Sequence, residues 1–196
     1  MMRRTALAFG LFGALVLSRM DLPQDAPKPQ DPVKAAEAAA VPVPKPGPEH
    51  ALFAEDVGAW DFTNKMYFEP GKPPSVMKGV YTTSVMPGGL WTFSDWKATD
   101  GSFHGHLVLG WDARAKKYRG TWVDSWTATP FSVEGTWDAE KRVMTSSIRG
   151  VDATGNPTEM IETVEYVSPK VRKATFRMEV PELGKIVIME SESTRR

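Results

Sequence analysis

The stretch FHGHLVLGWDARAKKYRGTWVDSW, residues 103–126, decides the fold class of this protein. Its two halves alternate apolar and polar residues on either side of DARAKK, the pattern of two antiparallel strands joined by a short loop. If residues 113–116 form the loop, three cross-strand pairs follow: Trp111 with Tyr118, Leu109 with Gly120, and Leu107 with Trp122. This register gathers the large apolar side chains on one face, which we expect to point inward. A slip by one residue would instead set His104 across from Asp124 and sort polarity less cleanly.

The same alternation recurs along the chain from residue 60, with turn signals about every 10–14 residues. We predict ten strands, at residues 60–68, 78–86, 90–98, 103–111, 118–126, 131–137, 143–149, 158–167, 173–180 and 185–192. One short helix is expected at residues 49–57, before Gly58. No strand–helix–strand spacing is present, which excludes a parallel sheet. The predicted fold is all-β, a single antiparallel up-and-down β-barrel of about ten strands with one short N-terminal helix.

The first 48 residues differ from the rest. A basic start, Met1–Arg4, precedes twelve apolar residues, Ala6–Leu17, a run typical of a signal peptide and too short to span a bilayer. Residues 21–48 are rich in Pro and Ala and poor in large apolar residues, as in a disordered tether. We therefore expect a signal peptide at 1–20, a tether at 21–48 and the barrel at 49–196. The protein should be exported, periplasmic or secreted, and held at the membrane if the signal is not cleaved.

Composition limits the chemistry. The formal net charge is zero, so no basic surface indicates nucleic-acid binding. The chain has no Cys, which excludes disulfides, thiolate metal sites and Cys nucleophiles. Phosphate-binding loops, the G-x-S-x-G turn and H-E-x-x-H are all absent from the sequence. No catalytic residue, cofactor, oligomeric state or membrane span of the mature chain is indicated.

Sorting the strands by face leaves a few polar side chains among large apolar ones. Each buried carboxylate or amide in such a place needs a partner. Two interpretations stay open: these groups satisfy Trp, Tyr or backbone groups or lie at the barrel rim, or they converge in a cavity on a small, partly apolar ligand. The residues concerned, with their aromatic neighbours, are Asn64, Asp95, Trp122, Asp124, Trp126 and Glu162.

His104 and His106 alternate on one strand and would therefore share a face, which is the spacing of a metal chelate. A metal site needs a third ligand, plausibly a carboxylate, and nothing in the sequence fixes one. We therefore predict two solvated histidines and no metal.

The run at residues 109–129 with EGTWD at 134–138 resembles the bacterial family called domain of unknown function 1579. Trp60 corresponds to the aromatic of its opening Gly-x-Trp, whereas Ile186 and Ser193 stand where a Glu and an aromatic are usual. The resemblance implies a calycin-like barrel, related in shape to lipocalins and nitrobindins, and implies no activity. It also implies a cation–π contact between Trp60 and Arg195. A haem site like that of nitrobindins would need an inward histidine, and the face assignment provides none. The motif residues are Gly110, Trp111, Asp112, Lys116, Lys117, Tyr118, Thr121, Trp122, Asp124, Ser125, Glu134, Gly135, Thr136, Trp137, Asp138, Asp152 and Gly155.

Three functions follow as hypotheses. The first is a protein that binds a small apolar or amphipathic ligand inside the barrel. The second is a structural or protein-interaction module of the cell envelope without a ligand. The third is an enzyme that uses two of Asp95, Asp124 and Glu162 as general acid and base, which requires the two to lie close together.

Overall fold

The computed structural model describes residues 44–69, 71–152, 154–181 and 183–196. The predicted signal peptide and all but the last five residues of the predicted tether lie outside these ranges. A short 3-10 helix, η1 (Pro48–His50), leads directly into α2 (Ala51–Asp56). Ten strands follow: β1 (Gly58–Met66), β2 (Ser75–Val85), β3 (Trp91–Ala98), β4 (His104–Asp112), β5 (Lys117–Asp124), β6 (Phe131–Asp138), β7 (Val143–Val151), β8 (Pro157–Ser168), β9 (Val171–Val180) and β10 (Gly184–Arg195).

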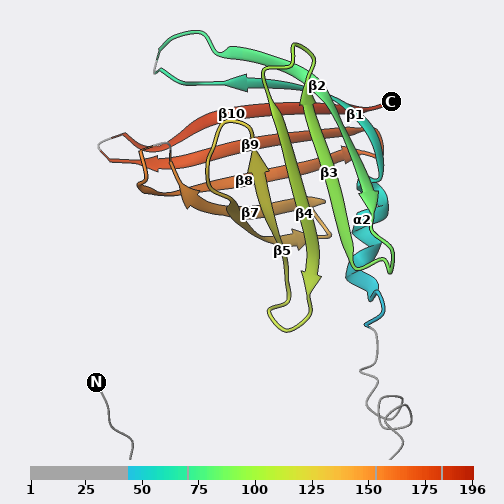
Figure 1. Cartoon of the computed structure of the whole chain (residues 1–196). Helices are drawn as coiled ribbons and strands as arrows, with labels where there is room; N and C mark the ends of the chain where they lie inside the picture. The colour runs from blue at the N-terminus through green and yellow to red at the C-terminus, as the bar shows by residue number, and fades with distance from the viewer. Residues whose placement is uncertain (1–43, 70, 153, 182) are drawn as a thin grey trace, which may run out of the picture. The chain divides into compact units, whose positions relative to one another are not determined.

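The strands form one closed antiparallel barrel in which each strand pairs with its neighbours in sequence (Figure 1). The first and last strands close the seam, with Trp60 opposite Arg195 and Met66 opposite Met189. Closure leaves no unpaired sheet edge, so the backbone groups of every strand find partners within the barrel. The predicted architecture, with its ten strands and its short N-terminal helix, is confirmed. Within the described residues, no helix is long and apolar enough to cross a bilayer.

The hairpin of β4 and β5 has the predicted register, with Leu107 opposite Trp122 and Trp111 opposite Tyr118. Asp112 organises its loop, because its Oδ1 accepts hydrogen bonds from the backbone N–H groups of Arg114 and Ala115, both at 2.9 Å. The apolar face points into the barrel. Leu107 and Trp122 pack against the core formed by Phe131, Val133 and Ile148, and Trp111 packs against a second core near α2.

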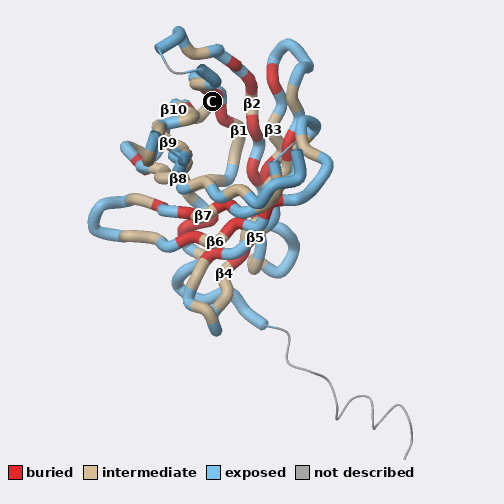
Figure 2. Tube along the Cα trace, turned by 90° about the vertical axis from the view of Figure 1, so that its left-hand side faces the viewer, coloured by how far each residue is buried: buried red, intermediate tan, exposed pale blue. Residues whose placement is uncertain are grey.

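Packing in the interior is uneven around the barrel (Figure 2). Buried residues are frequent on β1, β2, β6 and β7. By contrast, β8, β9 and β10 each contain a single buried residue, Tyr166, Arg172 and Ser193 respectively, all at the end where α2 lies. The other inward side chains of β8 and β9, such as Met160 and Phe176, keep partial accessibility. Because they face the interior, this accessibility indicates unfilled space on the β8–β10 side.

Helix α2 lies at one end of the barrel and is held there by two arginines. Arg172 is 4% exposed, and its guanidinium group stacks on Trp60 at 4.8 Å and on Tyr166 at 3.9 Å from the ring centroids. Arg195 stacks on Trp60 at 4.6 Å, which confirms the predicted cation–π contact. Both guanidinium groups also donate to the backbone carbonyl of Glu55 in the last turn of the helix. Cations at a helix C-terminus satisfy carbonyls that have no partner within the helix.

Three further hydrogen bonds fix the helix to the wall. The indole N–H of Trp60 donates to the carbonyl of Asp56 at 3.0 Å, and the hydroxyl of Tyr166 donates to the Asp56 carboxylate at 2.8 Å. At the other end of the helical segment, the Tyr118 hydroxyl donates to the carbonyl of Glu49 at 2.9 Å. Leu52 and Phe53 turn into the core beneath the helix. The helix therefore closes this end of the barrel.

We predict that the buried Arg172 is essential to stability. Arg172→Met should lower the free energy of unfolding by about 3 kcal/mol, because the Glu55 carbonyl loses a buried charged donor and the Asp56 carboxylate loses its ion-pair partner. Arg177→Met on the same strand is the matched control, since Arg177 is exposed and bonds only the hydroxyl of Thr163. Urea unfolding followed by Trp fluorescence measures both. An equal, small loss in the two variants would contradict the role given to Arg172.

Candidate functional site

The interior on the β7–β10 side contains the polar group that is least explained by the fold, the carboxyl of Glu162. Its neighbours along β8, Met160 and Val164, belong to the hydrophobic clusters, so Glu162 faces inward, as predicted. Its register partner on β7 is Ser146, which is also buried. The Glu162 carboxyl has no hydrogen-bond partner among the residues that the structure describes, and the side chain remains partly accessible. It therefore faces the interior without a polar partner from the described part of the chain.

Burial changes the acidity of this group. Loss of hydration raises the pKa of the Glu162 carboxyl from 4.5 to about 7, and the Asp56 carboxylate adds to the rise. Asp56 itself has its pKa raised to about 6 by burial, against the opposing effects of Tyr166 and Arg172. Asp56 contacts these two side chains and helps to hold α2 on the barrel, whereas the Glu162 carboxyl has no such partner and can bind another group. A carboxyl with a pKa near neutrality can act as a donor or as an acceptor.

Two other inward polar atoms are unsatisfied. The Oδ1 of Asn64 on β1 and the Nε1 of Trp96 on β3 are buried without a hydrogen-bond partner. One is an acceptor and the other a donor, and leaving each unpaired costs about 1–3 kcal/mol. Such groups are rare in folded proteins and need a reason. The inward position of Asn64 is as predicted.

An aromatic wall lies on the β1–β5 side of the interior. Tyr81 stacks on Trp96 with ring centroids 3.9 Å apart, and on Trp60 at 5.9 Å. Trp96 meets Trp122 edge to face at 6.1 Å, and Trp122 stacks on Phe103 at the same distance. This continuous aromatic surface lines part of the barrel in which β8 contributes Glu162. The predicted inward position of Trp122 is correct.

Asp124 lies at the rim, and its oxygens are occupied by the chain itself. Its Oδ2 accepts from the Trp122 indole at 2.6 Å. Its Oδ1 accepts from the backbone of Trp126 and from both the backbone and the hydroxyl of Thr127, at 2.8–3.0 Å. Asp124 thus fits the first of the two interpretations, in which the polar group satisfies Trp and backbone groups at the barrel rim. The residue ends β5 and positions Trp122.

The predicted inward position of Trp126 is wrong. Strand β5 ends at Asp124, and the turn that this carboxylate organises directs the chain away from the interior. Trp126 is 52% exposed, packs edge to face on Phe103 and donates its indole N–H to the carbonyl of Ser102 at 2.9 Å. It covers the rim of the barrel.

The predicted inward position of Asp95 is also wrong. Thr92, Ser94, Trp96 and Ala98 face the interior on β3, so Asp95 faces outward with Trp91 and Phe93. The aromatic residues on both faces made the phase of this strand ambiguous. Packing decides it, because Trp96 stacks on Tyr81 inside, whereas Trp91 lies over Gly110 outside, where a Cβ atom would come within 2.5 Å of the ring.

On the outer face, Asp95 contacts His104, His106 and Lys97. The hydrogen bond from Lys97 is the main cause that lowers the pKa of Asp95. Both strand histidines point outward, as predicted. The three carboxylates proposed for acid–base catalysis are thus separated: Asp95 lies outside the barrel, Asp124 at its rim and Glu162 within it. The arrangement does not provide the pair that the enzyme hypothesis requires.

Sequence reasoning missed Trp96, Tyr81 and Ser146 as interior residues near the site. The phase error on β3 hid Trp96. Tyr81 and Ser146 alternate with polar residues on strands whose faces differ little in polarity. One sequence feature could have placed Tyr81 inside. It lies two residues after Gly79 and therefore on the same face of β2, and Gly79 leaves room there for the Phe62 ring.

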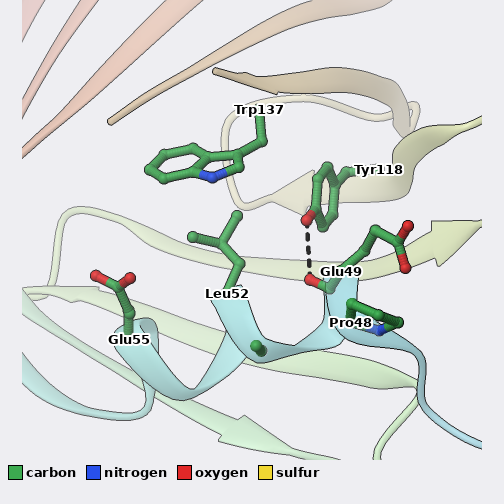
Figure 3. A pocket seen from close by; sticks show the side chains of 7 residues that line it. Pro48, Glu49, Leu52, Glu55, Tyr118 and Trp137 are labelled. Carbon is green, nitrogen blue, oxygen red and sulfur yellow. Dashed lines mark hydrogen bonds between the residues drawn. The ribbon is translucent and has the colours of Figure 1, made fainter. Parts of the chain in front are cut away.

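A separate hollow of 340 Å³ lies between α2 and the strands β5 and β6 (Figure 3). Leu52 points toward Trp137 across it, and Tyr118 is bonded to the backbone of Glu49. The hollow is open to solvent, and the Glu55 carboxylate beside it is paired with Arg142 at 2.5 Å. Its polar groups are engaged in holding the helix, so we place the candidate site in the interior.

The closed barrel with one helix-covered end defines this protein as calycin-like, the class that includes the lipocalins. The chain belongs to the family described as "Protein of unknown function (DUF1579)", whose model matches residues 45–195. Among solved structures, it is similar to the S-type phycobiliprotein lyase CPES from Guillardia theta, with a TM-score of 0.50 and 11% identity over 76% of this chain and 92% of the lyase chain. At this identity the similarity shows the fold alone. No curated protein matches the sequence.

We predict a pH-dependent stability that depends on Glu162. Its pKa in the folded state, about 7, lies above the ordinary 4.5, so the folded state binds the proton more tightly and loses stability as the pH rises between these values. Glu162→Gln should therefore gain about 3 kcal/mol relative to the wild type on going from pH 4 to about pH 8. Urea unfolding at both pH values measures this. Glu165→Gln, on the outer face of β8 three residues further along, should show no such gain. Equal curves for the wild type and Glu162→Gln would contradict the burial of the carboxyl.

Proposed function

We propose that this protein binds a small, partly apolar molecule inside the barrel and holds its polar group at Glu162. The observation that carries the proposal is an inward, partly accessible carboxyl that has a raised pKa and no partner among the described residues. In a filled core such a group would be paired or replaced by an apolar residue. A ligand donor provides the partner that the chain does not.

The surroundings of Glu162 fit a ligand with an apolar body. Trp96 and Trp122, the partly accessible rings of the aromatic wall, offer surface for stacking. Phe176 and Met160 add apolar surface beside the carboxyl. Asn64 and Trp96 add one buried acceptor and one buried donor that have no partner among the described residues. Few convergent polar groups among many apolar ones are typical of small-molecule sites. Because α2 covers one end of the barrel, we expect entry from the opposite end.

The ligand class follows from the carboxyl. A group with a pKa near 7 accepts hydrogen bonds from an amine or hydroxyl, and attracts a cationic amine once it is ionised. We therefore propose an aromatic or amphipathic molecule with an amine or hydroxyl group. The similar barrel of a phycobiliprotein lyase supports the view that this architecture suits an organic ligand.

Binding can be tested with the fluorescent probe aminoanthracene. We expect saturable enhancement of probe fluorescence on addition of the protein, together with quenching of Trp emission. Glu162→Leu should weaken aminoanthracene binding about tenfold, because a hydrogen bond to the amine is lost. Binding of methylanthracene, which has nearly the same shape without the donor, should not weaken.

A second variant guards against misfolding as the explanation. Ala174→Trp places a large side chain in the interior, whereas Thr175→Trp places it on the outer face of the same strand. Only Ala174→Trp should abolish probe binding. Absence of saturable binding by the wild type, or equal binding by these two variants, would refute an interior site.

We also propose that the protein is exported, on the basis of its basic start and apolar run at residues 1–17. Fusion of the full chain to alkaline phosphatase, which is active only outside the cytoplasm, should give active reporter in a bacterial host. Leu11→Arg interrupts the apolar run and should abolish reporter activity, whereas Leu22→Arg, beyond the run, should not. Activity retained by Leu11→Arg would exclude the apolar run as the export signal.

A further inference from the structure

The outer face of the barrel brings together three side chains that the sequence alone did not connect. Asp95 on β3 is the register partner of His106 on β4, and Lys97 is that of His104. The Nε2 of His104 lies 2.6 Å from Oδ1 of Asp95, and the Nδ1 of His106 lies 3.3 Å from the same oxygen. One ligand atom from each of the three residues lies within 4.8 Å of the other two. Two imidazole nitrogens and one carboxylate oxygen thus converge on a single point.

Neighbours constrain the ring of His106 and the backbone of His104. Phe93 stacks on His106 with ring centroids 5.2 Å apart, and the backbone N–H of His104 donates to the hydroxyl of Ser125 at 3.1 Å. The two histidine rings are themselves 4.5 Å apart. A preformed pair of ligands loses little freedom when it binds an ion.

One atom of this cluster is left without a role in the protein. The Nδ1 of His106 is buried, has no hydrogen-bond partner among the described residues and points toward the Asp95 carboxylate. A buried ring nitrogen normally has a partner, and a bound cation would be one. The residue is thus not explained as a solvated surface histidine.

We propose that Asp95, His104 and His106 form a binding site for a divalent transition-metal ion such as Zn²⁺. Imidazole and carboxylate ligands suit Zn²⁺, Cu²⁺ and Ni²⁺, whereas Mg²⁺ and Ca²⁺ require oxygen ligands. Three protein ligands fill all but one position of a tetrahedral Zn²⁺ and leave the last to water or another small ligand. The site lies on the outer face of β3 and β4, so it is independent of the interior site around Glu162.

Lys97 modulates this site. Its ammonium group lies 2.6 Å from Oδ2 of Asp95, the oxygen that does not face the histidines. The side chain is 60% exposed and can turn into solvent without losing buried contacts. Its positive charge opposes a bound cation. Removing that charge should therefore increase metal affinity.

The test is calorimetric titration of the full chain, without an affinity tag, with Zn²⁺. We expect binding of one ion per chain, and a loss in affinity of about a hundredfold or more in His104→Ala, His106→Ala and Asp95→Asn, since even changes around metal ligands cost 10–100-fold. His50→Ala is the matched control, because His50 is the one histidine of the sequence outside the cluster. It lies on η1, not on β3 or β4. That variant should bind Zn²⁺ like the wild type. Lys97→Met should bind it more tightly.

Co²⁺ gives a second readout that does not depend on heat. Substituted into the wild type, it should give visible absorption bands of a low-coordinate centre, and these should be absent from His106→Ala. Circular dichroism should show that all variants remain folded, as expected for outer-face residues. Failure of the wild type to bind Zn²⁺, or unchanged affinity in Asp95→Asn and His106→Ala, would overturn the proposal.

Discussion

Trp60, held between the guanidinium groups of Arg172 and Arg195, is the contact on which the rest of the barrel depends. It is fully buried and joins the first strand to the last two. The same two guanidinium groups hold the end of α2 by donating hydrogen bonds to the carbonyl of Glu55. One cluster therefore closes the seam between β1 and β10 and covers one end of the barrel. Cation–π stacking in a site without water is stronger than at the surface, so burial of this cluster strengthens it.

Closing the barrel in this way concentrates the tight packing at the helix end. The aromatic wall continues from Trp60 through Tyr81 and Trp96, whereas β8 to β10 are buried only next to the helix. Glu162 lies on the less tightly packed side of the barrel, and loss of hydration on burial raises the pKa of its carboxyl. The proposed ligand site is thus a consequence of where the large side chains lie in the barrel. A uniformly packed barrel would have no place for an unpaired carboxyl.

Much of this architecture could be predicted from the sequence, because alternation and turn signals report local geometry. The β4–β5 hairpin is the clearest example, since a single register separates its apolar and polar faces. Asp95 shows where alternation fails to assign the face of a strand. On β3 large aromatic residues lie on both faces, so alternation could not choose between them, and only contacts with Tyr81 and Gly110 decide.

The two candidate sites differ in how far they could be foreseen. Asn64, Trp122 and Glu162 were placed inside correctly, because their neighbours on the same strand are strongly apolar. Trp126 was misplaced because the end of a strand is set by hydrogen bonds to Asp124, which alternation does not report. The convergence of Asp95 on the two histidines depends on the register between β3 and β4, which no local pattern encodes.

The seam between β1 and β10 has a consequence for how the chain reaches its native state. The two strands that must meet are the first and the last of the barrel, about 130 residues apart along the chain. While the ribosome is still making β10, β1 has no partner on that side and Trp60 lacks Arg195, the arginine at the end of β10. The nascent chain thus keeps an unpaired strand edge until synthesis of the barrel is finished. The barrel can therefore close only after β10 has been made.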